Sequence, residues 1–346
     1  MTHDPNVPSP AATEHPHHPH HLPDPGMGLD RGTLVVAGVV VLGAIMSILD
    51  ITVVSVALQT FQREFDATSA QVAWTMTGYT LALATVIPLT GWAADRFGTK
   101  RLYLLAVLLF TLGSALCAAA TTLPMLVAFR VLQGLGGGML MPLGITILTR
   151  AAGPERVGRV MAVLGIPMLL GPIFGPIVGG ALIDSASWHW IFLINLPVGL
   201  LGLLATLRHM PNLRHASPGR FDLGGYLLLA AAMVSISLSL DGLGGLGWAR
   251  TLVVLLMVLG LAALAAYWLH ALRSPAPLFA PALFAVASYR VGVLGNLFAR
   301  IGSGAMPYLL PLLLQLALGF SPAQAGMMML PVALASMGIK RPITHV

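Results

Sequence analysis

Three ionisable side chains stand inside long apolar runs of this 346-residue sequence: Asp50, Arg130 and Arg300. Charged groups are rare in the hydrocarbon core of a membrane, and they usually mark substrate or proton pathways there. Asp50 and Arg130 are the obvious pair of opposite sign. A carboxylate beside a cation that moves can take up a proton on one side of a membrane and release it on the other. A static structural ion pair is the alternative reading.

The apolar runs around these two residues place them at one depth. The run with Asp50 is expected to end near residue 57 on the outer side, and the run with Arg130 to begin there near residue 123. At about 1.5 Å per residue, both side chains lie roughly 10 Å below the outer surface. We therefore expect Asp50 and Arg130 to be partners in proton coupling.

The charges inside the apolar runs also bear on the substrate. Asp50, Arg130 and Arg300 sum to a single positive charge. Cationic drugs prefer additional buried acids, so this sum favours neutral or anionic substrates, such as an organic acid. The candidate substrate-cavity residues are Gln133, Asn296, Arg300 and Gln315.

Enzymatic chemistry finds no support in the sequence. We find no Ser/His/Asp set, no Cys/His metal spacing and no Walker loop with a lysine, and the glycines of 134–138 have no strand before them. Cys117 is the only cysteine and is expected to be a plain buried residue. We expect no catalytic residue and no cofactor.

The N-terminal tail, residues 1–32, is rich in proline and histidine and lacks the apolar core of a signal peptide. Its composition predicts a disordered, solvated cytoplasmic tail without a metal site. Imidazole binds Zn²⁺, Ni²⁺ and Cu²⁺, so loose metal affinity is the alternative. The candidate ligands would be His17, His18, His20 and His21.

The composition predicts that the chain crosses a membrane many times. Hydrophobic residues make up 57% of the sequence and charged residues 9%, against about 25% charged in soluble domains. Apolar runs of about 20 residues recur, each long enough to span a bilayer as a helix. We expect ten such helices, near 33–57, 72–92, 102–121, 123–149, 159–183, 189–207, 223–241, 251–271, 290–316 and 323–340.

The basic residues predict the orientation of these helices. Nearly all Lys and Arg residues fall in one alternating set of gaps, and the other set holds only Arg63 and Arg250. Positive charge is concentrated on the cytoplasmic side, so the N-terminus is expected in the cytoplasm and the chain in the bacterial inner membrane. Basic residues that mark topology do not indicate a nucleic-acid partner.

A short charged loop, "GWAADRFGTKRLYLL" (91–105), joins the second and third expected helices. An ordinary basic loop would not need this spacing of glycines and charges. The pattern resembles the signature loop of the major facilitator superfamily, which implies a conformational-switch role. The matching residues are Gly91, Asp95, Arg96, Gly98, Lys100 and Arg101.

Other segments support the same resemblance. "LVAFRVLQGLGGGML" (126–140) is similar to the fourth-helix motif of the superfamily, and "LDITVVSVALQ" (49–59) to the first-helix motif of its fourteen-helix drug:proton antiporters. The segment 300–341 narrows the resemblance to the MdtD-like branch of that subfamily. The helix motif of drug antiporters is matched by Gly171, Gly175, Pro176, Gly179 and Gly180, whose small residues favour close helix packing.

The resemblance implies an all-α membrane fold, with about ten helices present of an expected fourteen. Two six-helix halves would flank two extra helices, and about four helices would be missing from a fragment or early-stopped product. The expected parts are the N-terminal half (33–207), a cytoplasmic linker (208–222), the extra helices (223–271) and the first two helices of an incomplete C-terminal half (290–346).

The resemblance also implies a function. It predicts a secondary active transporter that exports drugs or other small molecules by alternating access, with protons and a small-molecule substrate as its partners and the lipid bilayer around it. An organic-anion exporter of the citrate type is the alternative within transport. A truncated membrane protein that does not transport is the alternative from another class.

Overall fold

The computed structural model describes residues 31–153, 156–214, 220–244, 248–299, 313 and 317–319, with the backbone alone at 166, 167, 169, 170, 172, 173 and 244. All regular secondary structure in these residues is helical. The helices are α1 (Arg31–Glu64), α2 (Ser69–Phe97), α3 (Thr99–Ala118), α4 (Leu123–Ala152), α5 (Val157–Ser185), α6 (Trp190–Leu193), α7 (Asn195–His209), α8 (Leu223–Gly244), α9 (Arg250–Arg273) and the 3₁₀ helix η2 (Pro281–Ala285). Residues 287–299 are also helical.

The membrane spans match the sequence prediction. Seven described segments are long and apolar enough to cross a membrane, namely α1, α2, α3, α4, α8, α9 and the combined segment Trp190–His209. With α5 they correspond to the first eight predicted helices, so the all-α membrane fold is confirmed. The ninth, 290–316, is described as a helix up to residue 299, and the tenth, 323–340, lies outside the described residues.

The end of the first helix was predicted too early. The helix α1 continues to Glu64 instead of ending near residue 57. The reason is packing: Phe61 is fully buried, with its ring centroid 5.5 Å from that of Trp188 and 6.4 Å from that of Phe192. A polar stretch that carries one well-packed aromatic residue therefore stays helical.

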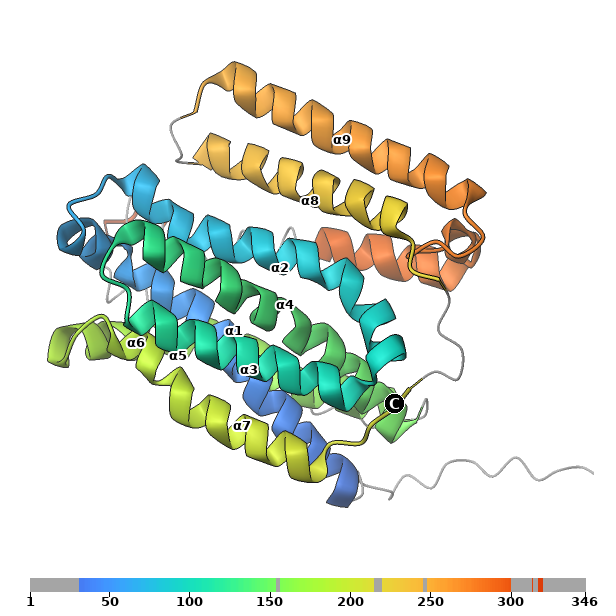
Figure 1. The fold of residues 1–346 in the computed structure, drawn as a ribbon, viewed down its shortest axis with the longest axis horizontal. Coiled ribbons are helices and arrows are strands. Elements are labelled where there is room, and N and C mark those ends of the chain that lie inside the picture. The colour runs from blue at the N-terminus through green and yellow to red at the C-terminus, as the bar shows by residue number, and fades with distance from the viewer. Residues whose placement is uncertain are drawn as a thin grey trace, which may run out of the picture.

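The helices α1 to α7 form one bundle, and α8 and α9 form an antiparallel pair beside it (Figure 1). Within the bundle α4 packs on α2 and α3, and α1 packs on α5. The pair of α8 and α9 contacts the bundle through α2. Aromatic rings contribute to this contact: Phe221 lies 4.7 Å from Trp92 and Trp74 lies 6.1 Å from Trp248, measured between ring centroids.

The glycines of α4 allow its backbone to approach two neighbouring helices. A Cβ atom at Gly134 would lie 2.5 Å from the carbonyl oxygen of Tyr79 in α2. A Cβ atom at Gly136 would lie 2.5 Å from the backbone nitrogen of Phe110 in α3. Real Cβ atoms do not come this close, so only glycine fits. These contacts fix α4 between α2 and α3, and α4 carries Arg130 and Gln133.

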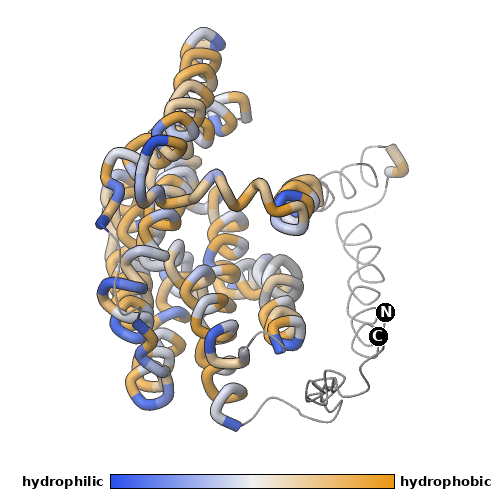
Figure 2. Tube along the Cα trace, turned by 90° about the vertical axis from the view of Figure 1, so that its right-hand side faces the viewer, coloured by the Kyte–Doolittle hydropathy of each residue, from blue (hydrophilic) through white to orange (hydrophobic). Residues whose placement is uncertain are grey.

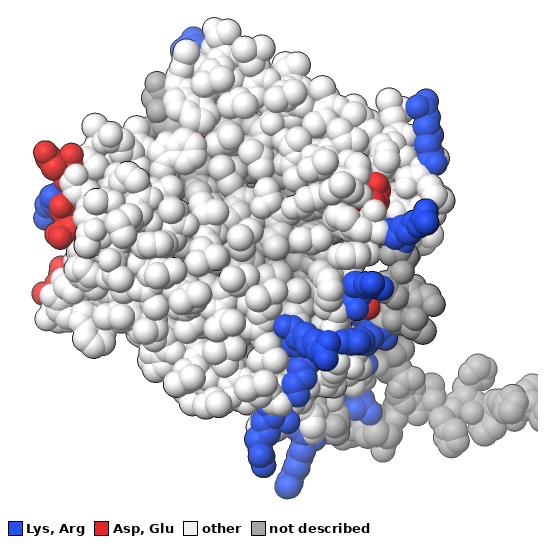
Figure 3. Space-filling model, in the orientation of Figure 1, with Lys and Arg blue, Asp and Glu red and all other residues white. Residues whose placement is uncertain are grey.

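The surface of the molecule is that of a multi-pass membrane protein. The hydropathy colouring shows apolar residues along the helices and hydrophilic residues mainly near their ends (Figure 2). The space-filling view shows an uncharged middle zone, with Lys and Arg gathered at one end and a cluster of acidic side chains at the other (Figure 3). Large apolar side chains such as Leu201 and Leu255 are more than half exposed, as expected where lipid replaces water.

The close approach of α4 can be tested by adding one methyl group. Gly136→Ala should lower the melting temperature of the chain in detergent, because overpacking costs about 1–3 kcal/mol. Gly38→Ala in α1 is the matched control: an added Cβ there meets no atom within 4 Å. Alanine is the better helix former by about 1 kcal/mol, so the control should keep or raise the melting temperature. The melting temperatures are measured by circular dichroism. Equal values for the two variants would contradict the packing argument.

Candidate functional site

Asp50 and Arg130 form an ion pair in the interior of the bundle. Their exposed fractions are 2% and 1%. Nη1 of Arg130 donates to Oδ2 of Asp50, and it also donates to Oε1 of Gln133 at 2.7 Å. Nε of Arg130 donates to the carbonyl oxygen of Thr75 at 3.0 Å. The guanidinium group is thus held by a carboxylate, an amide and a backbone carbonyl, which are the partners that a buried charge needs.

Amide groups complete the surroundings of the carboxylate. Nε2 of Gln133 donates to Oδ1 of Asp50 at 2.7 Å and to Oγ of Ser114 at 2.9 Å. Nδ2 of Asn195 donates to the same Ser114 oxygen at 2.9 Å and reaches Oδ1 of Asp50 at 3.5 Å. Each of these contacts of the Asp50 carboxylate oxygens is a bond from an N–H donor, so the geometry suits a carboxylate without a proton.

Aromatic rings pack against the cation. The guanidinium carbon of Arg130 lies 4.2 Å from the ring centroid of Tyr79 and 5.9 Å from that of Phe192. Both distances fall within the range of cation–π attraction. The hydroxyl of Tyr79 in turn lies 3.2 Å from Oγ of Ser47 on α1. The rings cover that side of Arg130, which is consistent with its near-complete burial.

The sixth membrane segment contributes two residues to the site and is interrupted between them. The sequence predicts one helix at 189–207, but the structure has α6 and α7, which meet at Ile194. Pro197 has no N–H group and cannot bond to the carbonyl of Leu193, so the helix is interrupted there. Phe192 at the end of α6 and Asn195 at the start of α7 then both face Arg130 and Asp50.

The glycine motif of α5 lies against the helix that carries Asp50. A Cβ atom at Gly171 or Gly175 would overlap the side chain of Ile48 or Thr52, and one at Gly179 would lie 3.0 Å from Cγ1 of Val53. Oγ1 of Thr52 also donates to the carbonyl of Gly171 at 3.3 Å. The remaining residues of the motif take no part in this contact: Gly180 faces open space and Pro176 is exposed.

The charged residues of the short loop lie at the end of the bundle where Lys and Arg gather. Asp95 pairs with Arg150 at 3.1 Å, and both side chains are about one-third exposed. Nζ of Lys100 donates to the carbonyl of Leu207 at 2.6 Å. Gly98 is the single residue between α2 and α3 and has a φ of +93°, which favours glycine. Arg96 and Arg101 are exposed, and a side chain at Gly91 would meet open space.

Comparison with known proteins decides the family. The family model of the Major Facilitator Superfamily matches residues 40–345. The chain belongs to this superfamily.

Curated relatives and a solved structure agree with this assignment. The chain is 43% identical over 308 residues to the putative multidrug resistance protein MdtD of Serratia proteamaculans, covering 89% of this chain and 64% of that protein. It is also 43% identical to the protein of the same name from Pectobacterium atrosepticum, of which it covers 66%. The chain thus spans about two thirds of the length of these relatives. The crystal structure of the human organic anion transporter MFSD10 (TETRAN) shares the fold, with a TM-score of 0.60, 18% identity and coverage of 89% of this chain and 71% of that one.

Of the candidate substrate-cavity residues that the structure describes in this major facilitator chain, Gln133 lies at the ion pair and Asn296 does not. Gln133 is fully buried among Asp50, Arg130 and Ser114. Asn296 is exposed on the helical segment 287–299. Arg300, Gln315 and the histidines of the tail lie outside the described residues. Within the described part of the chain, no group of three or more His, Cys, Asp or Glu side chains could hold a metal ion.

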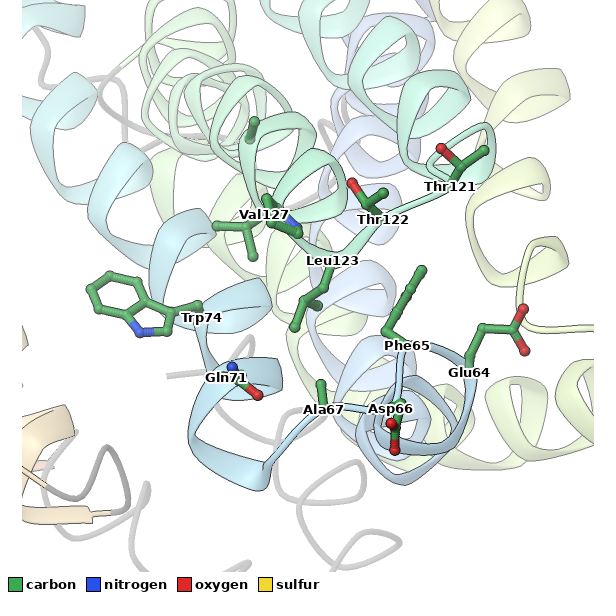
Figure 4. A pocket seen from close by; sticks show the side chains of 12 residues that line it. Glu64, Phe65, Asp66, Ala67, Gln71, Trp74, Thr121, Thr122, Leu123 and Val127 are labelled. Atoms are coloured by element: carbon green, nitrogen blue, oxygen red, sulfur yellow. The ribbon is translucent and has the colours of Figure 1, made fainter.

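A cavity of about 830 Å³ opens at the acidic end of the bundle. Its walls are the turn after α1, with Glu64 and Asp66, the start of α4 and Trp74 of α2 (Figure 4). Neither Asp50 nor Arg130 lines this cavity. The ion pair is therefore closed off from it in this conformation.

Two uncharged polar residues of the site, Asn195 and Ser114, were not predicted from the sequence. Asn195 and Ser114 are uncharged, and each stands in an apolar run. Asn195 is the only amide in the segment 190–209, which was the signal available. Asp241 near the end of α8 was also overlooked; its Oδ2 accepts a bond of 2.8 Å from Oγ1 of Thr77 on α2.

The contribution of the Asp50–Arg130 pair to the free energy of unfolding can be measured on the 346-residue chain. Asp50→Asn or Arg130→Gln alone should lower the free energy of unfolding by about 3–5 kcal/mol, because each leaves an uncompensated buried charge. The double variant should recover part of the loss. Asp184→Asn, which changes an exposed carboxylate, is the control and should have little effect. Strictly additive losses in the double variant, measured by thermal unfolding in detergent, would show that the two charges are independent.

Proposed function

We propose that the protein is a secondary active exporter of drugs or other small molecules, driven by inward proton flow. It would work by alternating access, with two halves rocking about a site near the middle of the membrane. The observation that carries the proposal is the buried ion pair of Asp50 and Arg130 in a chain of this superfamily. The name of the relatives, multidrug resistance protein, supports efflux as the direction of transport.

The proton step follows from the donors around Asp50. Arg130 and Gln133 both donate to its carboxylate oxygens. A proton on Asp50 would add an O–H group where only N–H donors converge, so at least one of these partners has to move. If Arg130 moves, it leaves the ring of Tyr79 and the carbonyl of Thr75 as well. Proton uptake would thus change the packing of α1 against α2 and α4.

The parts of the chain have separate roles in this proposal. Residues 33–207, which include α1 to α7, would form the N-terminal half, and 208–222 the linker. The extra helices of 223–271 correspond to α8 and α9, and 290–346 would begin the second half. We assign the N-terminus to the cytoplasm, since the end of the molecule that is rich in Lys and Arg would face that side.

Proton coupling can be tested in the full-length gene product reconstituted in liposomes. Ethidium and citrate serve as probes of a cationic and an anionic substrate, and a ΔpH-sensitive dye follows the protons. Efflux of one probe should accelerate with an inward proton gradient. Asp50→Asn should abolish the dependence of the rate on ΔpH, because the only carboxylate of the cluster is lost. The control Asp184→Asn should retain it.

The outcomes separate the parts of the proposal. Gradient-driven movement of citrate but not ethidium would give an organic-anion exporter with the same mechanism. If the efflux rate of Asp50→Asn still depended fully on ΔpH, Asp50 would take no part in proton coupling. Absence of gradient-driven movement of either probe, and of a broader drug panel, would contradict the exporter itself.

The orientation has its own test, which uses a membrane-impermeant maleimide on intact cells. Cys117 is fully buried, so background labelling should be low. Glu64→Cys should be labelled from outside, and Arg208→Cys only after the cells are made permeable. The reverse pattern would place the N-terminus outside.

A further inference from the structure

Residues 210–214, which we call the strap, join α7 to the segment before α8 and cross the turn between α2 and α3. The backbone N–H of Thr99 donates to the carbonyl of Leu213 at 3.0 Å. The N–H of Leu213 donates back to Oγ1 of Thr99 at 3.0 Å, and that hydroxyl donates to the carbonyl of Pro211 at 3.3 Å. One threonine therefore makes three hydrogen bonds to the strap.

These bonds satisfy groups that a helix end leaves without partners. The N–H of Thr99 belongs to the first turn of α3, where intrahelical acceptors are lacking. The carbonyl of Phe97 at the end of α2 accepts from Nη2 of Arg214 at 3.0 Å, and that of Leu207 in the last turn of α7 accepts from Nζ of Lys100. Both cations lie at helix C-termini, where positive charge is favourable. The strap and the residues of the turn thus supply hydrogen-bond partners to each other's helix ends.

The strap also lies directly over Gly98. A Cβ atom at Gly98 would overlap Oδ1 of Asn212 and would lie 2.8 Å from Nε of Arg214. At the start of the strap, Met210 is only 3% exposed and belongs to the main apolar core of the bundle. The strap is therefore anchored at one end by a buried side chain and fitted along its length to the turn.

We propose that the strap is a positioning element of the conformational switch: Thr99 binds it so that the α2–α3 turn, with Asp95 and Lys100, moves together with α7. This inference rests on the transport function proposed above. Asp95, three residues before Gly98, pairs with Arg150 of α4, so a displacement of the turn would act on that pair. Loss of the strap contact should change the rate of switching and leave the affinity for substrate unchanged, because the strap makes none of the described hydrogen bonds or ion pairs of Asp50.

The test uses Thr99→Val, which keeps the shape of the side chain and removes the hydroxyl, with Thr99→Ser as the conservative variant. Thr80→Val is the matched control on α2, since among the described residues the hydroxyl of Thr80 bonds to the carbonyl of Met76 in its own helix. Hydrogen exchange of residues 97–102 is followed in the 346-residue chain. In Thr99→Val it should accelerate about fivefold, as expected for the loss of a hydrogen bond. Thr99→Ser and Thr80→Val should exchange like the unsubstituted chain.

Transport is then measured in the full-length gene product with the probe that it moves. Thr99→Val should change the maximal rate per folded, reconstituted protein about fivefold with KM altered less than twofold, and Thr99→Ser should restore it. Because the rate is counted per folded protein, a loss of stability alone would leave it unchanged. Unchanged hydrogen exchange in Thr99→Val would show that the threonine does not hold the strap. Faster exchange with unchanged transport rates would reduce the strap to a structural contact. If the unsubstituted protein moves no probe, the proposed function fails, while the exchange data still decide the strap contact.

Discussion

The ion pair of Asp50 and Arg130 is the constraint on which the arrangement of the bundle depends. A charge in a membrane interior is tolerated only where a partner of opposite sign and hydrogen bonds surround it. From α4, Arg130 reaches two other helices: it bonds to Asp50 on α1 and to Thr75 on α2, and its cation lies on the ring of Tyr79, which also belongs to α2. The helices α1, α2 and α4 cannot slide past one another without breaking one of these contacts.

The position of α1 makes the pair suitable for coupling. On one side α1 presents Asp50 to Arg130, and on the other it meets the glycine face of α5 with no space to spare, as the overlap of a Cβ at Gly175 with Thr52 shows. A tightly packed interface responds to a displacement as a whole, because interiors are nearly as dense as crystals. In the transport cycle that we propose, a proton on Asp50 would shift α1 relative to both neighbours together.

The sequence predicted the helices better than their ends or their contacts. The apolar runs located the seven described membrane spans and α5, since hydrophobicity alone decides which stretches can enter a bilayer. The helix α1 extends to Glu64 because Phe61 packs on Trp188 and Phe192, and such a tertiary contact has no local signature. The partners Asp50 and Arg130 were predictable because charges in apolar runs are rare. Asn195 and the backbone bonds of the strap were not, since uncharged polar residues are common in membrane helices and backbone groups carry no sequence signal.

Close backbone contacts of α4 with α2 and α3 connect the two ends of the bundle. The α2–α3 turn and the strap lie at the end rich in Lys and Arg, whereas Arg130 lies two turns into α4 from the opposite end. Between them, Gly134 and Gly136 hold α4 against the backbones of α2 and α3 at distances that leave no room even for a methyl group. A movement of Arg130 that displaces α4 must therefore displace α2 and α3 with it, and the turn that joins these two helices moves too. Because Thr99 binds that turn to the strap, the displacement would reach α7 in the switch that we propose. In the proposed cycle, this rigid unit would convert a change of charge in the membrane into movement on the cytoplasmic side.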